Sequence, residues 1–232
     1  MIDFAPWDTL LRTYVDDRGR VDYERWQQVS KPSLDDWLRS ISETSLEALD
    51  QTSAIAFLIN LYNALTIQQV LQRYPIDSIR PTLLGLPNWW TFFRFFTKDI
   101  YMLRGRSLSL NAIEHDILRA QYSESRIHFA LVCASEGCPW LRAGAYWPDK
   151  LHQQLDEEAH QFIHNPEKVR YQADSNLLYC SKIFKWYSSD FCAEAETLTA
   201  YINQYQTMAP IPSGAEIAYL PYSWQLNQRT SS

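Results

Sequence analysis

The feature that most constrains the fold is a nearly unbroken apolar run, AIAFLINLYNALTIQQVL, at positions 54–71. Capping side chains gather just before it, and Pro75 disfavours helical geometry in the preceding residue, so we predict a helix from about 50 to 74. Because the run is apolar nearly all round, it is typical of a helix at the centre of a core. Asn60 and Asn63 interrupt it, which favours a core helix over a membrane span.

The segments that follow predict further helices and short strands. The almost wholly apolar IHFALVC, residues 127–133, indicates a strand buried on both faces, and 149–164 an amphipathic helix. Residues 168–180 and 100–106 each indicate a hairpin, and the aromatic-rich 81–100 a loop that runs into a strand. We therefore expect an α+β fold, in which the central helix packs on a small, mostly antiparallel sheet and is surrounded by other helices.

The length of the chain permits one large core. A domain of 232 residues buries roughly 70% of the surface that its unfolded chain exposes, so no disulfide or metal is needed for stability. We find no linker, internal repeat or low-complexity tract. We expect a single domain over residues 1–232, with a frayed polar tail at 228–232.

Charge and cysteine content limit the partners and the compartment. The net charge of −6 gives no basic surface for nucleic acid or an anionic membrane, so we expect neither as a partner. The N-terminus does not read as a secretory signal, so we expect a cytoplasmic protein. In that reducing compartment the four cysteines, Cys133, Cys138, Cys180 and Cys192, are expected to be free thiols unless they react or bind metal.

A carboxylate and a histidine stand together in LSLNAIEHDILR. Asn111 and Glu114 have the Asn-x-x-Glu form of a helix start, and Glu114 falls inside the apolar stripe of that helix while His115 lies at its edge. One interpretation makes Glu114 a general acid or base, or the group that orients one. In the other interpretation, Glu114 is part of a capping box, and its carboxylate accepts a hydrogen bond from the backbone at the start of its own helix.

Two amides lie on one face of the central helix. Asn60 and Asn63 are three residues apart, and a buried amide must find hydrogen-bond partners. Two interpretations are open. In one, the amides brace a neighbouring loop by bonding its backbone; in the other, they orient a substrate or a base.

His128 and Cys133 are the polar residues of the predicted strand. A lone His in a buried strand is more often a hydrogen-bonded core residue than a catalyst, and a buried thiol often only packs. Five residues of strand span about 16 Å, and the odd spacing puts the two side chains on opposite faces, so they cannot pair unless the strand is interrupted. His115 is the freer base for Cys133, and Cys138 can fold back towards His128.

We expect neither a metal nor a cofactor. The Cys-x4-Cys spacing of Cys133 and Cys138 is not the two-residue spacing of zinc knuckles, and no second pair follows. Six glycines, with no Walker loop, Gly-x-Ser-x-Gly elbow or His-Glu-x-x-His, remove the commonest nucleotide-binding and hydrolase motifs.

Several blocks in this order resemble the domain of unknown function 547 family: AFLINLYNALTIQQVLQRYP, LSLNAIEHDILR, RIHFALVCASEGCPWLR, SKIFKWYSSDF and LPYSWQLN. The resemblance covers about residues 18–227. In this chain Glu136 makes the loop between the cysteines more acidic, which opposes a lowered thiol pKa. By resemblance, the blocks of the family map onto Asn60, Asn63, Glu114, His115, His128, Cys133, Cys138, Pro139, Lys182, Trp186, Tyr187, Tyr222 and Trp224.

These residues lead us to expect a cysteine-dependent hydrolase or acyl transferase that acts on an amide bond of a small molecule or flexible peptide. A thiolate of Cys133 or Cys138 attacks, His128 or His115 moves the proton, Glu114 holds the imidazole, and an Asn amide or a loop N–H stabilises the oxyanion. Asn60, Asn63, Lys182, Trp186 and Tyr187 are expected to contact the substrate. A papain- or transglutaminase-like architecture enters only as an analogy.

The rival function is a binding module without chemistry. In this hypothesis the aromatic loop at 87–96 docks a protein partner or a ligand, because exposed aromatic clusters mark such surfaces.

Overall fold

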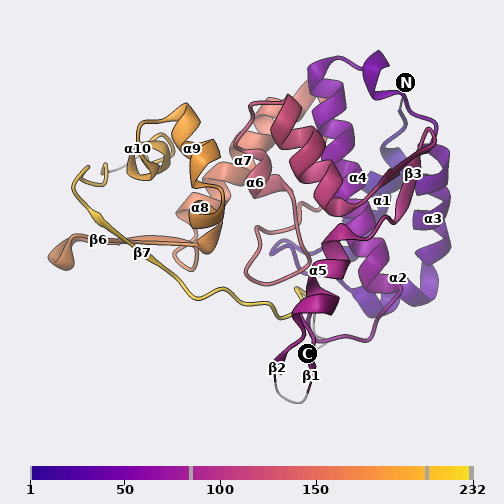
Figure 1. Ribbon diagram of the computed structural model, residues 1–232, viewed down its shortest axis with the longest axis horizontal. Coiled ribbons are helices and arrows are strands. Elements are labelled where there is room, and N and C mark those ends of the chain that lie inside the picture. The colour runs from indigo at the N-terminus through magenta and orange to yellow at the C-terminus, as the bar shows by residue number, and fades with distance from the viewer. Residues whose placement is uncertain (1, 84–85, 207–208, 230–232) are drawn as a thin grey trace.

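The computed structural model describes residues 2–83, 86–206 and 209–229. The molecule is elongated, with a helical body at one end and a small sheet with its own helices at the other (Figure 1). This arrangement confirms the predicted α+β class. Leu84 and Gly85, in the predicted aromatic loop, and residues 230–232 of the predicted tail lie outside the described residues.

The helical body forms around α4, Gln51–Leu71, which confirms the predicted central helix. Asp50 caps it by accepting a hydrogen bond from the Ser53 backbone N–H at 2.8 Å. The helix is long and apolar enough to cross a membrane, but 94% of its most apolar 18-residue window is buried within the chain. Its apolar surface is therefore already covered by the rest of the protein.

Three N-terminal helices cover one side of α4. Their apolar faces place Trp7 and Trp37 in a stacked pair, with ring centroids 5.5 Å apart. Two hairpins and an aromatic-rich helix follow α4 along the chain. The β3–β4 pairing confirms the hairpin predicted at 100–106. The elements are α1 (Ala5–Tyr14), α2 (Tyr23–Val29), α3 (Lys31–Ser40), η1 (Leu46–Ala48), β1 (Thr82–Leu83), β2 (Leu86–Pro87), α5 (Trp89–Thr97), β3 (Tyr101–Leu103) and β4 (Arg106–Leu108).

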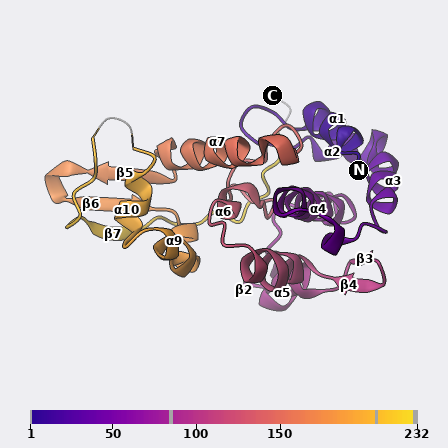
Figure 2. The same ribbon diagram turned by 90° about the horizontal axis from the view of Figure 1, so that it is seen from above.

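The other end of the molecule has a second apolar cluster. Helix α7, Leu151–His164, lies along the long axis and joins the two ends (Figure 2). The predicted hairpin forms antiparallel strands β5 and β6, and a late strand, β7, pairs with β6 in parallel. The elements are β5 (Val169–Gln172), η4 (Ala173–Ser175), β6 (Leu177–Cys180), α8 (Lys182–Trp186), α9 (Ser188–Glu194), α10 (Leu198–Asn203) and β7 (Glu216–Tyr219).

The predicted strand IHFALVC is wrong, because none of residues 127–133 belongs to a strand. Residues Ile127–Ala130 form the short helix α6, and the Leu131 N–H closes it by bonding the Ile127 carbonyl at 2.9 Å. The chain is extended only from Leu131 onward. A short run that is buried on all sides has no periodicity, so the sequence could not distinguish a buried strand from a buried helical turn.

The predicted aromatic loop is also wrong in its second half. Trp89–Thr97 is helix α5, and the Asn88 side chain caps it by accepting from the Thr91 N–H at 3.1 Å. The long aromatic run concealed that cap, because aromatic residues are also frequent in strands. The predicted tail is ordered at its start, since Gln228 pairs with Val21.

Candidate functional site

A cleft of about 520 Å³ opens where the helical body meets α8 and the C-terminal segment. Aromatic side chains are the largest group in its wall, which also contains ionisable side chains and the sulfur atoms of two cysteines. Such a concave, mainly apolar site with a few convergent polar groups is typical of ligand-binding clefts. The residues that line the cleft include Tyr62, Arg80, Trp89, Phe92, Phe93, Glu114, His115, His128, Cys133, Cys138, Lys182, Trp186, Tyr187, Tyr222 and Trp224.

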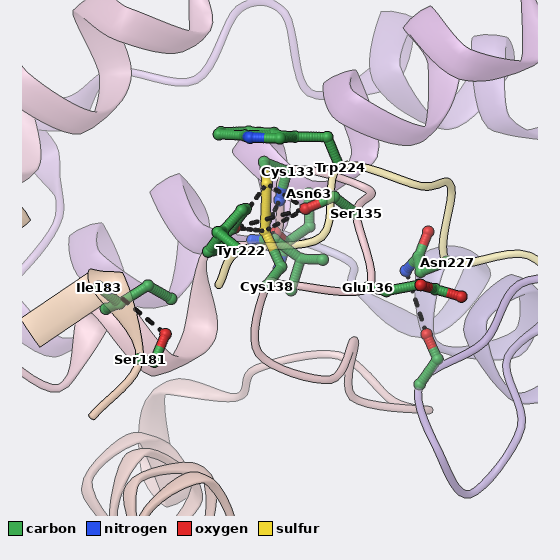
Figure 3. Close-up of a disulfide and its surroundings, with 12 residues drawn as sticks. Asn63, Cys133, Ser135, Glu136, Cys138, Ser181, Ile183, Tyr222, Trp224 and Asn227 are labelled. Atoms are coloured by element: carbon green, nitrogen blue, oxygen red, sulfur yellow. Dashed lines mark hydrogen bonds between the residues drawn. A yellow bond between two sulfur atoms is a disulfide. The ribbon is translucent and has the colours of Figure 1, made fainter. Parts of the chain in front are cut away.

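Cys133 and Cys138 form a disulfide in this wall (Figure 3). The expectation of free thiols is wrong for this pair, because the loop between them folds back until their Cα atoms are 6.3 Å apart, within the normal range for a disulfide. The reasoning from the cellular compartment carried no information about that geometry. Cys180 and Cys192 are free, as predicted.

The loop folds back because it is bound to the C-terminal segment. Gly137 and Glu136 donate backbone hydrogen bonds to the Ser223 and Gln225 carbonyls, at 3.0 and 2.9 Å. A Cβ atom at Gly137 would lie 2.7 Å from the Ser223 carbonyl and from the Tyr222 ring, so only glycine permits this approach. Ala134 has a positive φ of 59°, a conformation that non-glycine residues rarely adopt.

The sulfur of Cys138 lies within reach of three donors. The Cys133 backbone N–H and the Tyr222 hydroxyl are each 3.1 Å from it, and the Ser135 hydroxyl is 3.5 Å away. Figure 3 shows these groups converging on the disulfide. Burial raises the pKa of Tyr222, so its hydroxyl remains a donor at neutral pH. Cys133 is the more exposed of the two cysteines, since Cys138 is only 3% exposed.

His128 is held by a carboxylate that we did not predict. Its Nε2 lies 2.8 Å from Asp190 Oδ2, and Arg119 donates to both Asp190 oxygens at 2.6 and 2.7 Å. These contacts hold the pKa of Asp190 well below its usual range, with the Arg119 hydrogen bonds as the main cause. Burial lowers the pKa of His128, against a smaller raising effect from Asp190. His128 is therefore a neutral imidazole fixed by an ionised carboxylate.

Glu114 belongs to the cleft and not to a capping box. Its carboxylate accepts a hydrogen bond from the Tyr187 hydroxyl at 2.5 Å, across 73 positions of sequence. The Tyr187 ring in turn stacks on the His128 imidazole, with centroids 3.8 Å apart. Glu114 lies in the first turn of a π-helical segment, η2 (Ala112–Arg119), and the Asn111 side chain does not cap it. The helical residues begin at Leu110, and Ser109 before them accepts from the Ala112 N–H through its hydroxyl. The predicted Asn111 cap is wrong.

We predicted that Glu114 holds the imidazole, but the carboxylate that contacts His128 is that of Asp190. Among the hydrogen bonds of the described residues none joins Glu114 to a histidine. His115 lines the cleft and places its Nδ1 2.8 Å from Arg119 Nη1, so it is linked to the same ion pair from the other side.

The two amides of α4 brace the fold, and neither lines the cleft. Asn60 accepts from the Trp7 indole N–H and the Tyr146 backbone N–H, and donates to the Ala56 and Tyr146 carbonyls, at 2.8–3.1 Å. Asn63 donates to the Ala130 carbonyl at 2.9 Å and accepts from the Val132 N–H at 2.9 Å. Their predicted contact with a substrate is wrong for this reason. Asn63 instead holds the chain that leads directly into Cys133.

Of the residues taken from the family resemblance, all except Asn60 and Asn63 line the cleft. Lys182, Trp186 and Tyr187 all line it, and their shared origin is helix α8 and the residue after it. Trp186 packs on Tyr222 and Trp224, with ring centroids 4.8 and 5.9 Å apart. Asp190 and Arg119 were missed, although Asp190 stands in the block SKIFKWYSSDF and Arg119 ends LSLNAIEHDILR.

Within the described ranges, no group of three or more His, Cys, Asp and Glu side chains has the arrangement of a metal site. The polar groups that line the cleft include two imidazoles, the Glu114 carboxylate, tyrosine hydroxyls, a lysine, an arginine and a pair of sulfur atoms.

Comparison with known proteins gives one match. No curated protein and no solved structure matches the chain. A family model described as "Protein of unknown function, DUF547" matches residues 46–163, which is 118 of 232 residues. The matched span includes α4, Glu114, His128 and both bonded cysteines, whereas α8 and Asp190 lie beyond it. The chain belongs to the DUF547 family, the domain of unknown function 547 that its sequence blocks resemble.

Proposed function

We propose that the cleft is the active site of a thiol-dependent hydrolase or acyl transferase that acts on an amide bond, in the form of the protein whose Cys133–Cys138 bond is reduced. The observation that carries the proposal is that His128, which Asp190 holds from behind at 2.8 Å, lines the same cleft as both sulfur atoms. A thiol nucleophile, an imidazole and a carboxylate that orients it are the parts that this chemistry uses.

The imidazole has the properties of a general base. With Nε2–H donated to Asp190, the Nδ1 atom of His128 is the unprotonated acceptor. Burial keeps the pKa of His128 below its usual value, so the ring is neutral and accepts a proton at neutral pH. Asp190, fixed by Arg119, then stabilises the imidazolium that forms.

Reduction supplies the nucleophile. The three donors around Cys138 Sγ favour a thiolate there, since hydrogen bonds to the charged form lower a thiol pKa. The thiolate attacks the carbonyl carbon, and the electron pair of the C=O bond moves to oxygen. His128 takes the proton of the thiol as the thiolate forms, and the imidazolium gives it to the leaving amine as the C=O bond re-forms and the C–N bond breaks. Water or another nucleophile then attacks the thioester and releases the acyl group with the thiol.

The oxyanion needs a donor other than the predicted Asn amide, because both amide groups of α4 are occupied by backbone partners. Tyr222 is the best-placed side chain, since its hydroxyl faces the sulfur atoms and stays protonated. The aromatic walls favour a substrate with an apolar or aromatic acyl group, and Arg80 and Lys182 add positive charge to the lining. The papain-like analogy remains part of this proposal.

A binding module is the second candidate, and a specific observation favours it. The disulfide leaves neither sulfur free for attack, and α5 exposes Trp89, Trp90 and Phe93, each at least half exposed. In this alternative the cleft and α5 hold a ligand, and the polar groups only maintain the fold.

The test compares turnover of a panel of N-acyl amides by the reduced protein, the oxidised protein and Asp190→Asn. We expect turnover only after reduction, and a loss of at least about 100-fold in kcat/KM for Asp190→Asn. Asp156→Asn is the matched control, because Asp156 also pairs with an arginine, Arg126, but, among the hydrogen bonds of the described residues, has none to a side chain that lines the cleft. Ligand binding without turnover, unchanged by reduction, would contradict the hydrolase and support the module.

A further inference from the structure

We propose that Cys133 and Cys138 form a redox centre that exchanges with low-molecular-weight thiols, in which the incoming thiol attacks Cys133 and Cys138 is the leaving sulfur. This activity goes beyond amide chemistry and does not require it. The proposal rests on the unequal surroundings of the two sulfur atoms.

Access distinguishes the two cysteines first. Both cysteines line the cleft, but Cys133 is partly exposed, whereas Cys138 is only 3% exposed. Because an exchanging thiolate must approach a sulfur directly, the cleft gives it a route to Cys133. Pro139 and Trp140 follow Cys138, and the bonded C-terminal segment covers the loop from the other side.

The second difference between the two cysteines is how well each sulfur is stabilised as a leaving group. The backbone N–H of Cys133 lies 3.1 Å from Cys138 Sγ, and no corresponding backbone donor to Cys133 Sγ is found in the described part of the chain. The Tyr222 hydroxyl is also nearer to Cys138 Sγ, at 3.1 Å, than to Cys133 Sγ, at 3.5 Å. A thiol with the lower pKa leaves faster, so bond cleavage that leaves the charge on Cys138 is favoured.

The reaction balances with two thiols as the reductant. A thiolate R–S⁻ forms a bond with Cys133 Sγ, the Cys133–Cys138 bond breaks, and its electron pair remains on Cys138 Sγ. A second R–S⁻ attacks the R sulfur of this mixed disulfide and releases R–S–S–R with the Cys133 thiolate. Two thiols are thereby oxidised to one disulfide, and the protein gains two electrons and, at equilibrium, the protons that its thiols bind.

The other two cysteines serve as internal references. Cys180 is fully buried, and burial raises its pKa to about 12, so it is inert. Cys192 is exposed and free and lies outside the cleft. Exchange at the cleft is thus distinguishable from the reaction of an ordinary surface thiol.

The experiment uses Cys138→Ser and Cys133→Ser, each also carrying Cys192→Ser, incubated with oxidised glutathione and read by intact mass and peptide mapping. We expect Cys138→Ser to form the mixed disulfide at Cys133 at least about tenfold faster than Cys133→Ser forms it at Cys138. In the otherwise intact chain, Tyr222→Phe is expected to slow reduction by reduced glutathione by about three- to tenfold, through loss of one hydrogen bond to the leaving sulfur.

Equal capture by the two cysteine variants, or faster capture at Cys138, would overturn the assignment. So would reduction of the intact chain no faster than that of the same disulfide in a denatured control. Both readouts follow the state of the sulfur atoms alone, so they remain decisive if the chain hydrolyses no amide.

Discussion

The molecule contains two buried polar networks built on the same kind of sequence signal, a polar side chain within an apolar element. The Asn60 network is closed, since each polar atom of that amide is paired with Trp7, Ala56 or Tyr146. The network around His128 and Glu114 borders an open cleft. Burial therefore does not distinguish the residues that brace the fold from those of the candidate site, whereas access to a cavity does.

The closed network has the largest expected effect on stability. Asn60→Ala leaves the Trp7 indole N–H and both backbone groups of Tyr146 without their partner, at about 1–3 kcal/mol for each buried group. We expect the free energy of unfolding to fall by about 3–5 kcal/mol in denaturant titrations. Thiol reactivity in the folded fraction should not change.

Asn203→Ala is the matched control, because that amide also pairs with both backbone groups of one residue, Ile211, but is only half-buried. Its expected loss is about 1–2 kcal/mol. If Asn60→Ala abolished cleft reactivity in the folded protein, the separation of the two networks would be wrong.

In the cleft network, Tyr187→Phe removes the donor to Glu114. A hydrogen bond to a charged group contributes about 1.5–3 kcal/mol, and we expect a loss of that size together with weaker substrate or ligand binding. Tyr171→Phe makes the same chemical change at an exposed hydrogen bond to Asn176, and should cost less than about 0.5 kcal/mol. Equal losses in the two variants would remove the distinction between the cleft and the surface.

The loop between the cysteines gives a smaller effect. Gly137→Ala places a methyl group against the Ser223 carbonyl and the Tyr222 ring, and we expect about 1–2 kcal/mol of destabilisation from overpacking. The Tyr222 hydroxyl should move away from the sulfur atoms and slow thiol exchange. Gly214→Ala is the control, since a Cβ there meets nothing within 4 Å. Unchanged exchange in Gly137→Ala would argue against the role of Tyr222.

The smallest expected effect is on the pH dependence of stability. Burial depresses the pKa of His128 below 6.5, so the unfolded chain binds that proton more readily than the folded chain does. The contribution of His128 to stability is complete above about pH 6.5 and is lost as the pH falls towards its folded pKa. His128→Gln should therefore flatten the free energy of unfolding between pH 6.5 and 5. If the free energy of unfolding of His128→Gln depended on pH as steeply as that of the unchanged protein, a group other than His128 would be responsible for the pH dependence.

Local signals in the sequence predicted the parts of the fold that depend on them. The capped apolar run gave α4, and the alternating residues around 168–180 gave the β5–β6 hairpin. The α6 turn and the parallel β6–β7 pairing depend on contacts between distant segments, which periodicity does not encode. This is also why IHFALVC was assigned to a strand.

The residues of the candidate site also fall into those with a local sequence signal and those that depend on distant contacts. Glu114, His128 and both bonded cysteines were found because each stands out within a short apolar segment. Asp190 is 62 positions from His128 and lies on the short helix α9, of which Phe191 is the buried residue, so the local sequence does not distinguish it from an ordinary surface carboxylate. The disulfide depended on the bend at Ala134 and on backbone bonds to 223–225, neither of which has a signature in the loop itself.

The claim that reactivity belongs to the cleft is tested most directly by competitive alkylation of the fully reduced protein at pH 6, with limiting iodoacetamide and peptide mapping. The account predicts that label appears first on the Cys133–Cys138 pair, ahead of the exposed Cys192, because the sulfur of Cys138 has donors that stabilise a thiolate and none to Cys192 Sγ is found in the described part of the chain. Labelling of Cys192 first, or at the same rate as the pair, would contradict it.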